Sequence, residues 1–303
     1  GALLENGFLE RRGRGKPAVL RRQQKASETG AYLQAIPHVL SGTILSADEW
    51  RDNTRLRYNL EPLDLPQRCD GCGAKATVEH LLSCKCGGLV HIRHEDVSGM
   101  FAHLNSCALS PSKVEREPRI HSGVGRRARE IAASEGAAAP NSATPTPNQS
   151  TLDLDETRGD VGVHGFWQKG RLCIFDVRIT DTDARTYRHK SAKAVLSAQE
   201  KEKKDKYLAT CHELRKDFTP LVYSVDGMAA REAKAAEKRL ASYLAKKWHR
   251  QYSQMVHYVR VQMALSVVRS NTLLCRGCRD RAPVRPFIQS GAALYEMRTW
   301  RDA

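Results

Sequence analysis

The chain has 303 residues and a formal net charge of +15, from 49 lysines and arginines against 34 acidic residues. Such an excess favours a polyanionic partner such as DNA or RNA. No apolar run approaches the ~18 residues of a membrane-spanning helix, so we expect no membrane partner. Nine cysteines are present and several cluster within residues 69–86, which indicates metal binding in a reducing compartment rather than disulfides.

The first part of the chain is predicted to be a basic arm followed by a helical segment. Residues 1–27 are rich in arginine and lysine, which is typical of an arm or a linker. Because the chain starts with Gly1 rather than Met and opens in mid-pattern, we expect it to be a piece of a longer polyprotein. Residues 28–90 form the helical segment with a metal knuckle, and Ser46 and Glu49 have the spacing of a capping box at a helix start.

The knuckle has the pattern C-x2-C-x7-H-x3-C. Two thiolates two residues apart can hold one face of a zinc ion, and a histidine and a third cysteine one helical turn apart can close the tetrahedron. Cys86 competes for the fourth position, but Cys84 and Cys86 are too close in sequence to bind one metal easily. His91 and His94 are nearby competitors. The expected ligands are Cys69, Cys72, His80 and Cys84.

A helix, a strand and an insertion are predicted after the knuckle. Apolar residues at helical spacing predict the helix over residues ~91–107, and a strand follows at Val114–Glu117. Residues 118–157 are interpreted as a flexible insertion, because much of this stretch is alanine, serine, threonine and proline with few large apolar residues. Arg126 and Arg127 in it are expected to touch phosphate if the insertion lies along DNA, and a solvated charge run is the alternative.

Two β-rich runs, residues 160–166 and 172–179, follow the insertion, and the Gln168-Lys169-Gly170 turn between them predicts a hairpin. An α/β order with a hairpin at its centre favours a small mixed sheet flanked by helices, over residues 91–227. The remaining predicted elements are a long helix (188–214), a short strand (221–224) and two helices between residues 228 and ~274, within a C-terminal helical extension over 228–303.

Two acids lie on that hairpin. Asp160 begins the first run, and Asp176 interrupts the apolar sequence LCIFDVRI of the second. A carboxylate within a buried strand is costly unless it binds a cation or pairs with one. Two carboxylates that meet across a hairpin can hold Mg²⁺, which prefers oxygen ligands and activates water against a phosphodiester. The alternative for Asp176 is a salt bridge with a neighbouring arginine such as Arg178.

The helix after the hairpin carries lysines that suit the same chemistry. Lys203, Lys204 and Tyr207 share one helix face, and Lys206 lies one turn after Lys203. A lysine near a metal can orient the attacking water or neutralise the charge that develops on phosphorus. Without the neighbouring hairpin, a run of lysine and glutamate would be interpreted as an ordinary solvated face.

These features together resemble a known family. The order of the knuckle, an Arg93-His94 helix start, an RGD strand at Asp160, a DVR strand at Asp176 and a KKxKY helix is similar to the carboxy-terminal region of certain non-LTR, LINE-like retrotransposon polyproteins. Those elements carry a restriction-like endonuclease of the PD-(D/E)xK fold behind their reverse transcriptase. The resemblance covers residues 29–275 in ordered pieces.

The resemblance implies an α/β, restriction-endonuclease-like fold and magnesium-dependent nicking of target DNA in the nucleus. Its implied partners are DNA, the element RNA and the upstream reverse transcriptase, with no small-molecule cofactor. Gly159 stands where the family has proline, and Arg178 stands where restriction enzymes commonly have lysine, so the catalytic lysine is expected from the next helix. The residues that match catalytic positions are Asp160, Asp176, Lys203, Lys206, Tyr207 and Glu117. Those expected on nucleic acid are Arg93, Arg126 and Arg127.

Other patterns admit two interpretations. Cys275-x2-Cys278 is either incidental or half of a zinc site that borrows ligands across space. His94 and Glu95 either have a surface or capping role or lie near the nuclease centre. The rival function is a nucleic-acid-binding zinc module without catalysis, from a decayed or domesticated element. A ubiquitin-pathway zinc module would require eight ligands, and the sequence offers one well-formed set of four.

Overall fold

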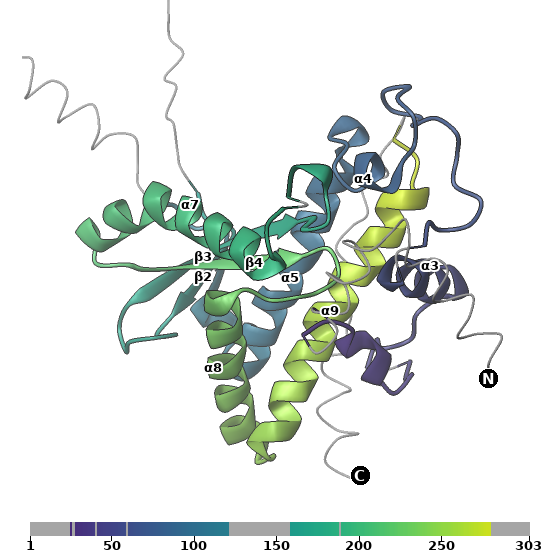
Figure 1. Ribbon diagram of the computed structural model, residues 1–303. Helices are drawn as coiled ribbons and strands as arrows, with labels where there is room; N and C mark the ends of the chain where they lie inside the picture. The colour runs from purple at the N-terminus through teal and green to yellow at the C-terminus, as the bar shows by residue number, and fades with distance from the viewer. Residues whose placement is uncertain are drawn as a thin grey trace, which may run out of the picture.

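A computed structural model describes residues 25, 28–39, 41–58, 60–120, 158–187 and 189–279 of the chain (Figure 1). In this part of the chain a four-stranded mixed sheet is covered by helices on both faces. None of the described helices is long and apolar enough to cross a membrane. The helices are α3 (Ala47–Arg57), α4 (Val78–Leu81), α5 (Leu89–Ala108), α7 (Ala192–Glu213), α8 (Arg231–Trp248) and α9 (Tyr252–Arg276).

The sheet has the order β1-β2-β3-β4, and each strand overlaps its predicted range. Strands β1, β2 and β3 are antiparallel, and β4 is parallel to β3. A parallel neighbour needs a crossover connection, which α7 supplies. The predicted hairpin between residues 160 and 179 is therefore confirmed at the centre of a mixed sheet. The strands are β1 (Val114–Arg116), β2 (Val161–His164), β3 (Leu172–Thr180) and β4 (Asp217–Ser224).

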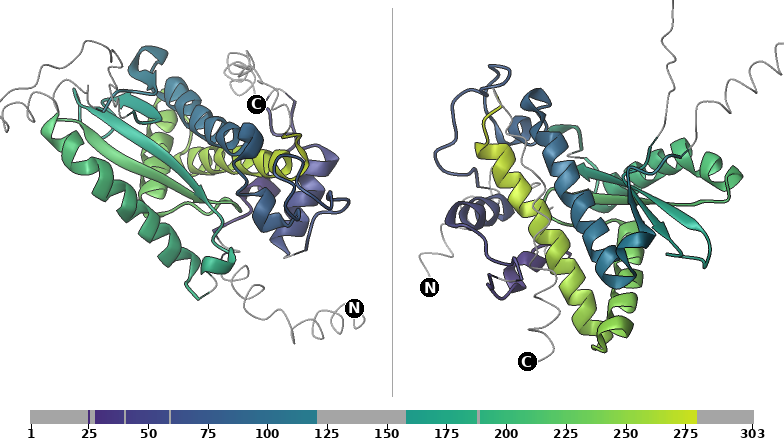
Figure 2. Two further views of the ribbon diagram at one scale, coloured as in Figure 1. Left: turned by 90° about the horizontal axis from the view of Figure 1, so that it is seen from above. Right: turned by 180° about the vertical axis from the view of Figure 1, so that it is seen from behind.

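Both faces of the sheet are buried. On one face, Ile174 of β3 and Phe218 of β4 pack against Tyr207 of α7. On the other face, Phe175 of β3 belongs to a core shared with α5, α8 and α9, and Figure 2 shows α5 and α9 side by side there. A strand covered on both faces is apolar at successive positions rather than at alternate ones. Asp176, which is 5% exposed, is thus a buried carboxylate in an otherwise apolar strand.

The two C-terminal helices belong to the same core as the sheet. Leu240 and Leu244 of α8 and Val259 and Met263 of α9 are buried together with residues of α5 and of the strands. The described helices after position 228 are therefore packed against the sheet.

Local signals explain where the helices begin. Ser46 accepts a hydrogen bond from the backbone of Glu49, whose side chain accepts one from the backbone of Ser46, so the predicted capping box is confirmed. Ser191 caps α7 by accepting from the backbone N–H of Ala194. Such caps satisfy backbone donors that the first turn of a helix leaves without partners.

The end of the predicted basic arm is also part of the fold. Lys25 is 2% exposed, and its Nζ lies 3.0 Å from Asp183 and 2.6 Å from Asp226, just beyond the ends of β3 and β4. The rest of that arm lies outside the described residues. Of the predicted insertion, residues 118–120 are described and Ile120 is fully buried, whereas residues 121–157 lie outside the described part.

Candidate functional site

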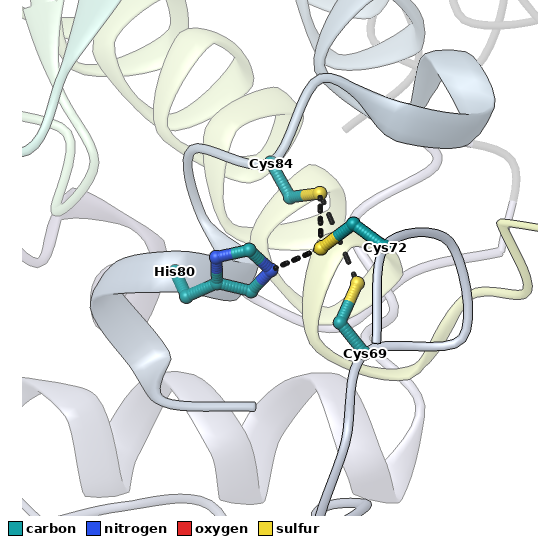
Figure 3. Close-up of side chains that lie close together, drawn as sticks. All are labelled: Cys69, Cys72, His80 and Cys84. Carbon is teal, nitrogen blue, oxygen red and sulfur yellow. Dashed lines mark hydrogen bonds between the residues drawn. The ribbon is translucent and has the colours of Figure 1, made fainter. Parts of the chain in front are cut away.

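The knuckle brings its four predicted ligands together. Cys69 and Cys72 lie in a tight loop closed by the Arg68–Lys75 bridge, and His80 lies on α4. Cys84 follows one turn later, since its backbone N–H donates to the carbonyl of His80 (2.8 Å). The four ligand atoms all lie within 4.8 Å of one another (Figure 3).

The distances in the knuckle suit zinc. The Sγ atoms of Cys69 and Cys84 are 3.8 Å apart, and those of Cys84 and Cys72 are 3.9 Å apart. With zinc–sulfur bonds of ~2.3 Å, the edge of a tetrahedron is about 3.8 Å. Burial opposes ionisation of Cys69, but hydrogen bonds with His80 and with backbone groups of the loop lower the pKa of this thiol to about 6. Since the thiolate is the form that binds zinc, this Cys3His cluster can hold a zinc ion.

The fourth member of the Cys3His cluster is Cys84 rather than Cys86. Cys84 is buried within the cluster, whereas Cys86 is exposed and lies outside it. His91 and His94, the other competitors, lie on α5 and are also outside the set. The helical spacing between His80 and Cys84 thus predicts correctly which four side chains come together.

The residues that follow α9 pack on the knuckle. Arg279 is 4% exposed, its backbone N–H donates to Asp70 (2.7 Å), and its guanidinium group donates to the carbonyl of Leu81 (3.0 Å). Gly87 has a φ of 70°, and a Cβ there would lie 2.4 Å from the Cα of Arg279. Only glycine allows this approach without strain. The knuckle is therefore packed into the core directly before α5 begins.

The pair Cys275 and Cys278 does not contribute to the metal cluster of the described residues. Cys275 is buried beside Leu274 and Leu89, and burial raises the pKa of its thiol to about 12. Cys278 is exposed and hydrogen-bonds to Asp70. Cys275 therefore belongs to the apolar core between α9 and the start of α5.

The two predicted acids lie close together on the hairpin. The backbone N–H of Asp160 donates to the carbonyl of the residue before Asp176 (2.9 Å). The Oδ2 atom of Asp160 accepts a hydrogen bond from the backbone N–H of Val177 (2.5 Å), and its Oδ1 atom lies 2.9 Å from Nε2 of His94 on α5. The Oδ2 atom of Asp176 lies 2.5 Å from Nζ of Lys203 on α7. We call these four side chains, His94, Asp160, Asp176 and Lys203, the acid centre.

The charges of the acid centre influence one another. Burial raises the pKa of Asp176, and the negative charge of Asp160 raises it further, while Lys203 and His94 oppose the shift. Burial acts to lower the pKa of His94, but the hydrogen bond and the charge of Asp160 outweigh burial, so the pKa of His94 is raised. Since the charge of Asp160 disfavours the ionised form of Asp176, an added cation would favour that form.

The salt bridge suggested between Asp176 and Arg178 is not the one that forms. Arg178 pairs with Glu202 of α7 (2.7 Å), and Asp176 pairs with Lys203. Both contacts join β3 to α7. They place the lysine helix directly over the carboxylate in the strand.

Local packing and hydrogen bonding explain why the residue before Asp160 is glycine. The backbone N–H of Gly159 donates to the carbonyl of Pro118 (3.0 Å), a hydrogen bond that proline cannot make. A Cβ at position 159 would lie 2.3 Å from Cγ2 of Ile174. Glycine at this position is therefore explained by the close approach of this segment to β3.

Glu117 and Tyr207 are not brought to the acids through their side chains. The backbone N–H of Glu117 donates to the carbonyl of Asp160 (3.0 Å), but its side chain is 60% exposed and lies 4.0 Å from Arg158. Tyr207 is 8% exposed and belongs to the apolar cluster beneath α7. Their catalytic assignments are therefore not supported, because one side chain points to solvent and the other is core.

Lys203, one of the predicted lysines, contacts Asp176 of the centre. The ammonium group of Lys206 lies 4.8 Å from the centre of the Tyr207 ring. Lys204 pairs with Glu232 at the start of α8. Lys203 and Lys206 thus share the Tyr207 ring as a neighbour, at 5.8 Å and 4.8 Å from its centre, whereas Lys204 has different surroundings.

Arg93 lies inside the protein. It is 5% exposed, and burial lowers its pKa to about 10, although the charge of Asp181 partly compensates. Its Nε and Nη1 atoms have no hydrogen-bond partner among the described residues. The structure therefore does not support its expected contact with nucleic acid. Arg126 and Arg127 lie outside the described residues.

His94 is the functional candidate that sequence reasoning ranked too low. The signal that could have found it is its helical spacing, because His94, Val97 and Phe101 lie at i, i+3 and i+7 and share the face that packs on the sheet.

No protein-family model matches the chain, and no curated protein matches it either. The assignment of this site therefore rests on its own geometry and chemistry.

Proposed function

We propose that this chain is a magnesium-dependent DNA endonuclease that nicks target DNA for the integration of a retrotransposon. The observation that carries the proposal is the approach of Asp160, Asp176 and Lys203 from a hairpin and the following helix. Neighbouring carboxylates with an adjacent ammonium group suit phosphodiester hydrolysis. The net charge of +15 supports a polyanionic substrate.

Each residue has a distinct role in the proposed reaction. Asp160 and Asp176 hold the cation through carboxylate oxygens, the ligands that hard cations prefer. Bound Mg²⁺ supplies Lewis acidity and lowers the pKa of water. Lys203 orients the attacking water or neutralises the charge that develops on the phosphate in the transition state.

The order α5-β1-β2-β3-α7-β4 supports a restriction-like fold. It places the acids on the central hairpin and the lysine on the crossover helix. This agrees with a family in which the catalytic lysine comes from the next helix, as the arginine at position 178 implies. Nuclear localisation, the element RNA and the upstream reverse transcriptase are parts of the same proposal, and they rest on the resemblance alone.

In this proposal the zinc knuckle supports the nuclease in two ways. Zinc stabilises the segment from which α5 begins, because Arg279 and the Cys275 region pack against it. The knuckle also assists DNA binding through exposed basic side chains, which attract phosphate and make the affinity salt-dependent. The exposed basic residues around it are Arg68, Lys75 and Lys85.

A nucleic-acid-binding module without catalysis is the second candidate. It is favoured by the low exposure of Asp176 and its contact with Lys203, because a buried ion pair can also hold β3 and α7 together without reacting. In that function the zinc knuckle and the basic surface are retained, as in a decayed or domesticated element.

The test is the nicking of supercoiled plasmid by the zinc-loaded chain in Mg²⁺, compared with Asp176→Ala and with Asp205→Ala. Asp205 is exposed on the same helix as Lys203 and serves as the matched control. We expect nicking by the wild type and by Asp205→Ala, and a loss of at least ~100-fold in Asp176→Ala, since a metal ligand supplies several kcal/mol of transition-state stabilisation. Equal nicking by wild type and Asp176→Ala would refute the assignment. Binding without nicking by either would favour the second candidate.

A further inference from the structure

We infer that His94 is a positioning residue of the acid centre, which holds the carboxylate of Asp160 in the orientation that receives a divalent cation. The inference rests on the proposed function and adds a residue from a third element, α5. It identifies a hydrogen-bond donor on the helix that connects the zinc knuckle to the sheet.

The carboxylate of Asp160 is held at both oxygens. Its Oδ2 atom accepts from the backbone N–H of Val177 at 2.5 Å, and its Oδ1 atom lies 2.9 Å from Nε2 of His94. Asp160 precedes the first residue of β2, so the strand geometry does not fix the orientation of the Asp160 side chain. Each carboxylate oxygen has two lone pairs, and one donor on each leaves the other available to a cation.

His94 is mounted on a rigid support. Val97 and Phe101, on the same face of α5, are fully buried against the sheet. The guanidinium group of Arg116 on β1 donates to Glu95 (2.6 Å) and to Ser98 (3.1 Å), and so ties this part of α5 to the edge strand. A donor whose own position is determined by packing can orient a ligand accurately.

The role requires only a donor at the Nε2 position. An imidazole donates there when it is neutral with its proton on Nε2, and also when it is protonated. The side chain of His94 is 30% exposed, so its removal leaves no large buried cavity. Glutamine can present an N–H near the same position, whereas alanine and leucine cannot.

The experiment measures Mn²⁺ binding to the zinc-loaded chain by electron paramagnetic resonance. Mn²⁺ that still binds to Asp176→Asn is counted as bound outside the acid centre and is subtracted. The variants are His94→Ala, His94→Leu and His94→Gln, and plasmid nicking is measured in parallel. His91→Gln is the matched control, because His91 is exposed on the same helix.

We expect His94→Ala and His94→Leu to weaken Mn²⁺ binding about tenfold or more, as the loss of a hydrogen bond to a charged group implies. His94→Gln should stay within about threefold of the wild type, and His91→Gln should be unchanged. Wild-type binding in both donorless variants would overturn the inference. So would a His94→Gln variant as weak as His94→Ala, since the role would then not be that of a donor.

The parallel nicking assay separates the two claims. If the wild type binds Mn²⁺ through Asp176 but does not nick, the proposed endonuclease fails and the role of His94 is still decided by the binding data. If the wild type nicks and the donorless variants bind normally, the inference fails alone. If the wild type binds no Mn²⁺ at the centre, both are contradicted.

Discussion

The knuckle and the acid centre both offer ligands to a cation, and they are built in opposite ways. The knuckle takes four ligands from one short segment, residues 69–84, and its sulfur and nitrogen atoms form a closed set suited to zinc. The acid centre draws its side chains from α5, the β2–β3 hairpin and α7. It offers only two carboxylates, each in contact with a basic side chain. A closed, local set is typical of structural metals, and an incomplete set with basic neighbours is typical of reactive sites.

One helix joins the two regions. α5 begins at Leu89, directly after the knuckle, and carries His94 to the carboxylate of Asp160 one turn later. The knuckle side of this helix is packed against α9, and Arg279 fastens the end of α9 to the knuckle. Metal in the knuckle should therefore affect the acid centre through the position of α5, and without any direct contact between the two.

The largest effect should come from opening the zinc set. Cys72→Ser removes one of the four ligands, and because zinc binding contributes to folding free energy, we expect a loss of zinc and a fall in melting temperature of about 10 °C or more. Hydrogen exchange should accelerate at the start of α5. Zinc content and calorimetry check the prediction. Cys278→Ser is the control, and it should retain the zinc content and the melting temperature of the wild type. Unchanged melting in the zinc-free variant would mean that the knuckle does not support the fold.

A smaller effect should separate two lysines of the same helix. Lys203→Met removes the ammonium group beside Asp176 and should slow nicking about 100-fold, as the loss of an electrostatic contact in the transition state does. Lys206→Met removes a group that lies over Tyr207 and should change nicking by less than about threefold. Single-turnover rates with saturating protein check this difference. Equal losses in both variants would contradict the assignment of the catalytic lysine.

The smallest effect concerns a buried acid outside both regions. Glu237 on α8 accepts a hydrogen bond from the hydroxyl of Tyr223 (2.9 Å), and burial raises its pKa to about 7, compared with an ordinary value of 4.5. Between pH 4.5 and about pH 7, the carboxyl group of Glu237 binds a proton more tightly in the folded state than in the unfolded state. The free energy of unfolding should therefore fall as pH rises through this window, and the penalty is complete above pH 7.

Glu237→Gln should remove that penalty. We expect the variant to be more stable than the wild type by ~1–3 kcal/mol at pH 8, with a much smaller difference at pH 5. Denaturant unfolding at both pH values measures the difference. A gain that is independent of pH would show that the buried carboxyl group does not titrate as described. Glu237 can be compared with Asp176, since both are buried carboxyl groups. The partner of Asp176 is the ammonium group of Lys203, whereas the partner of Glu237 is the hydroxyl group of Tyr223.

Local features of this fold were predictable from sequence. The capping box at Ser46, the β2–β3 hairpin and the Cys3His cluster all depend on residues close together in the chain. The choice of Cys84 over Cys86 followed from the length of one helical turn. Steric and hydrogen-bonding rules act over such short spacings, so the sequence alone contains enough information.

Features that depend on how the helices are rotated were not predictable. Arg93 and His94 are neighbours, yet one points into the core towards Asp181 and the other to Asp160. Successive helical residues differ by about 100° in direction. The packing of α5 against both the sheet and α9 therefore decides which of the two side chains enters the core and which reaches Asp160. Lys25 pairs with Asp183 and Asp226 for a similar reason, because only the folded chain brings these distant segments together.

The central claim is that zinc supports the fold while the acid centre does the cutting. The most direct measurement is plasmid nicking by the zinc-loaded chain, freed of other divalent cations, with and without added Mg²⁺, beside Asp160→Asn. We predict no nicking with zinc alone, nicking on addition of Mg²⁺, and its loss in Asp160→Asn while zinc content stays at one per chain. Nicking with zinc alone, or nicking by Asp160→Asn at the wild-type rate, would contradict the account.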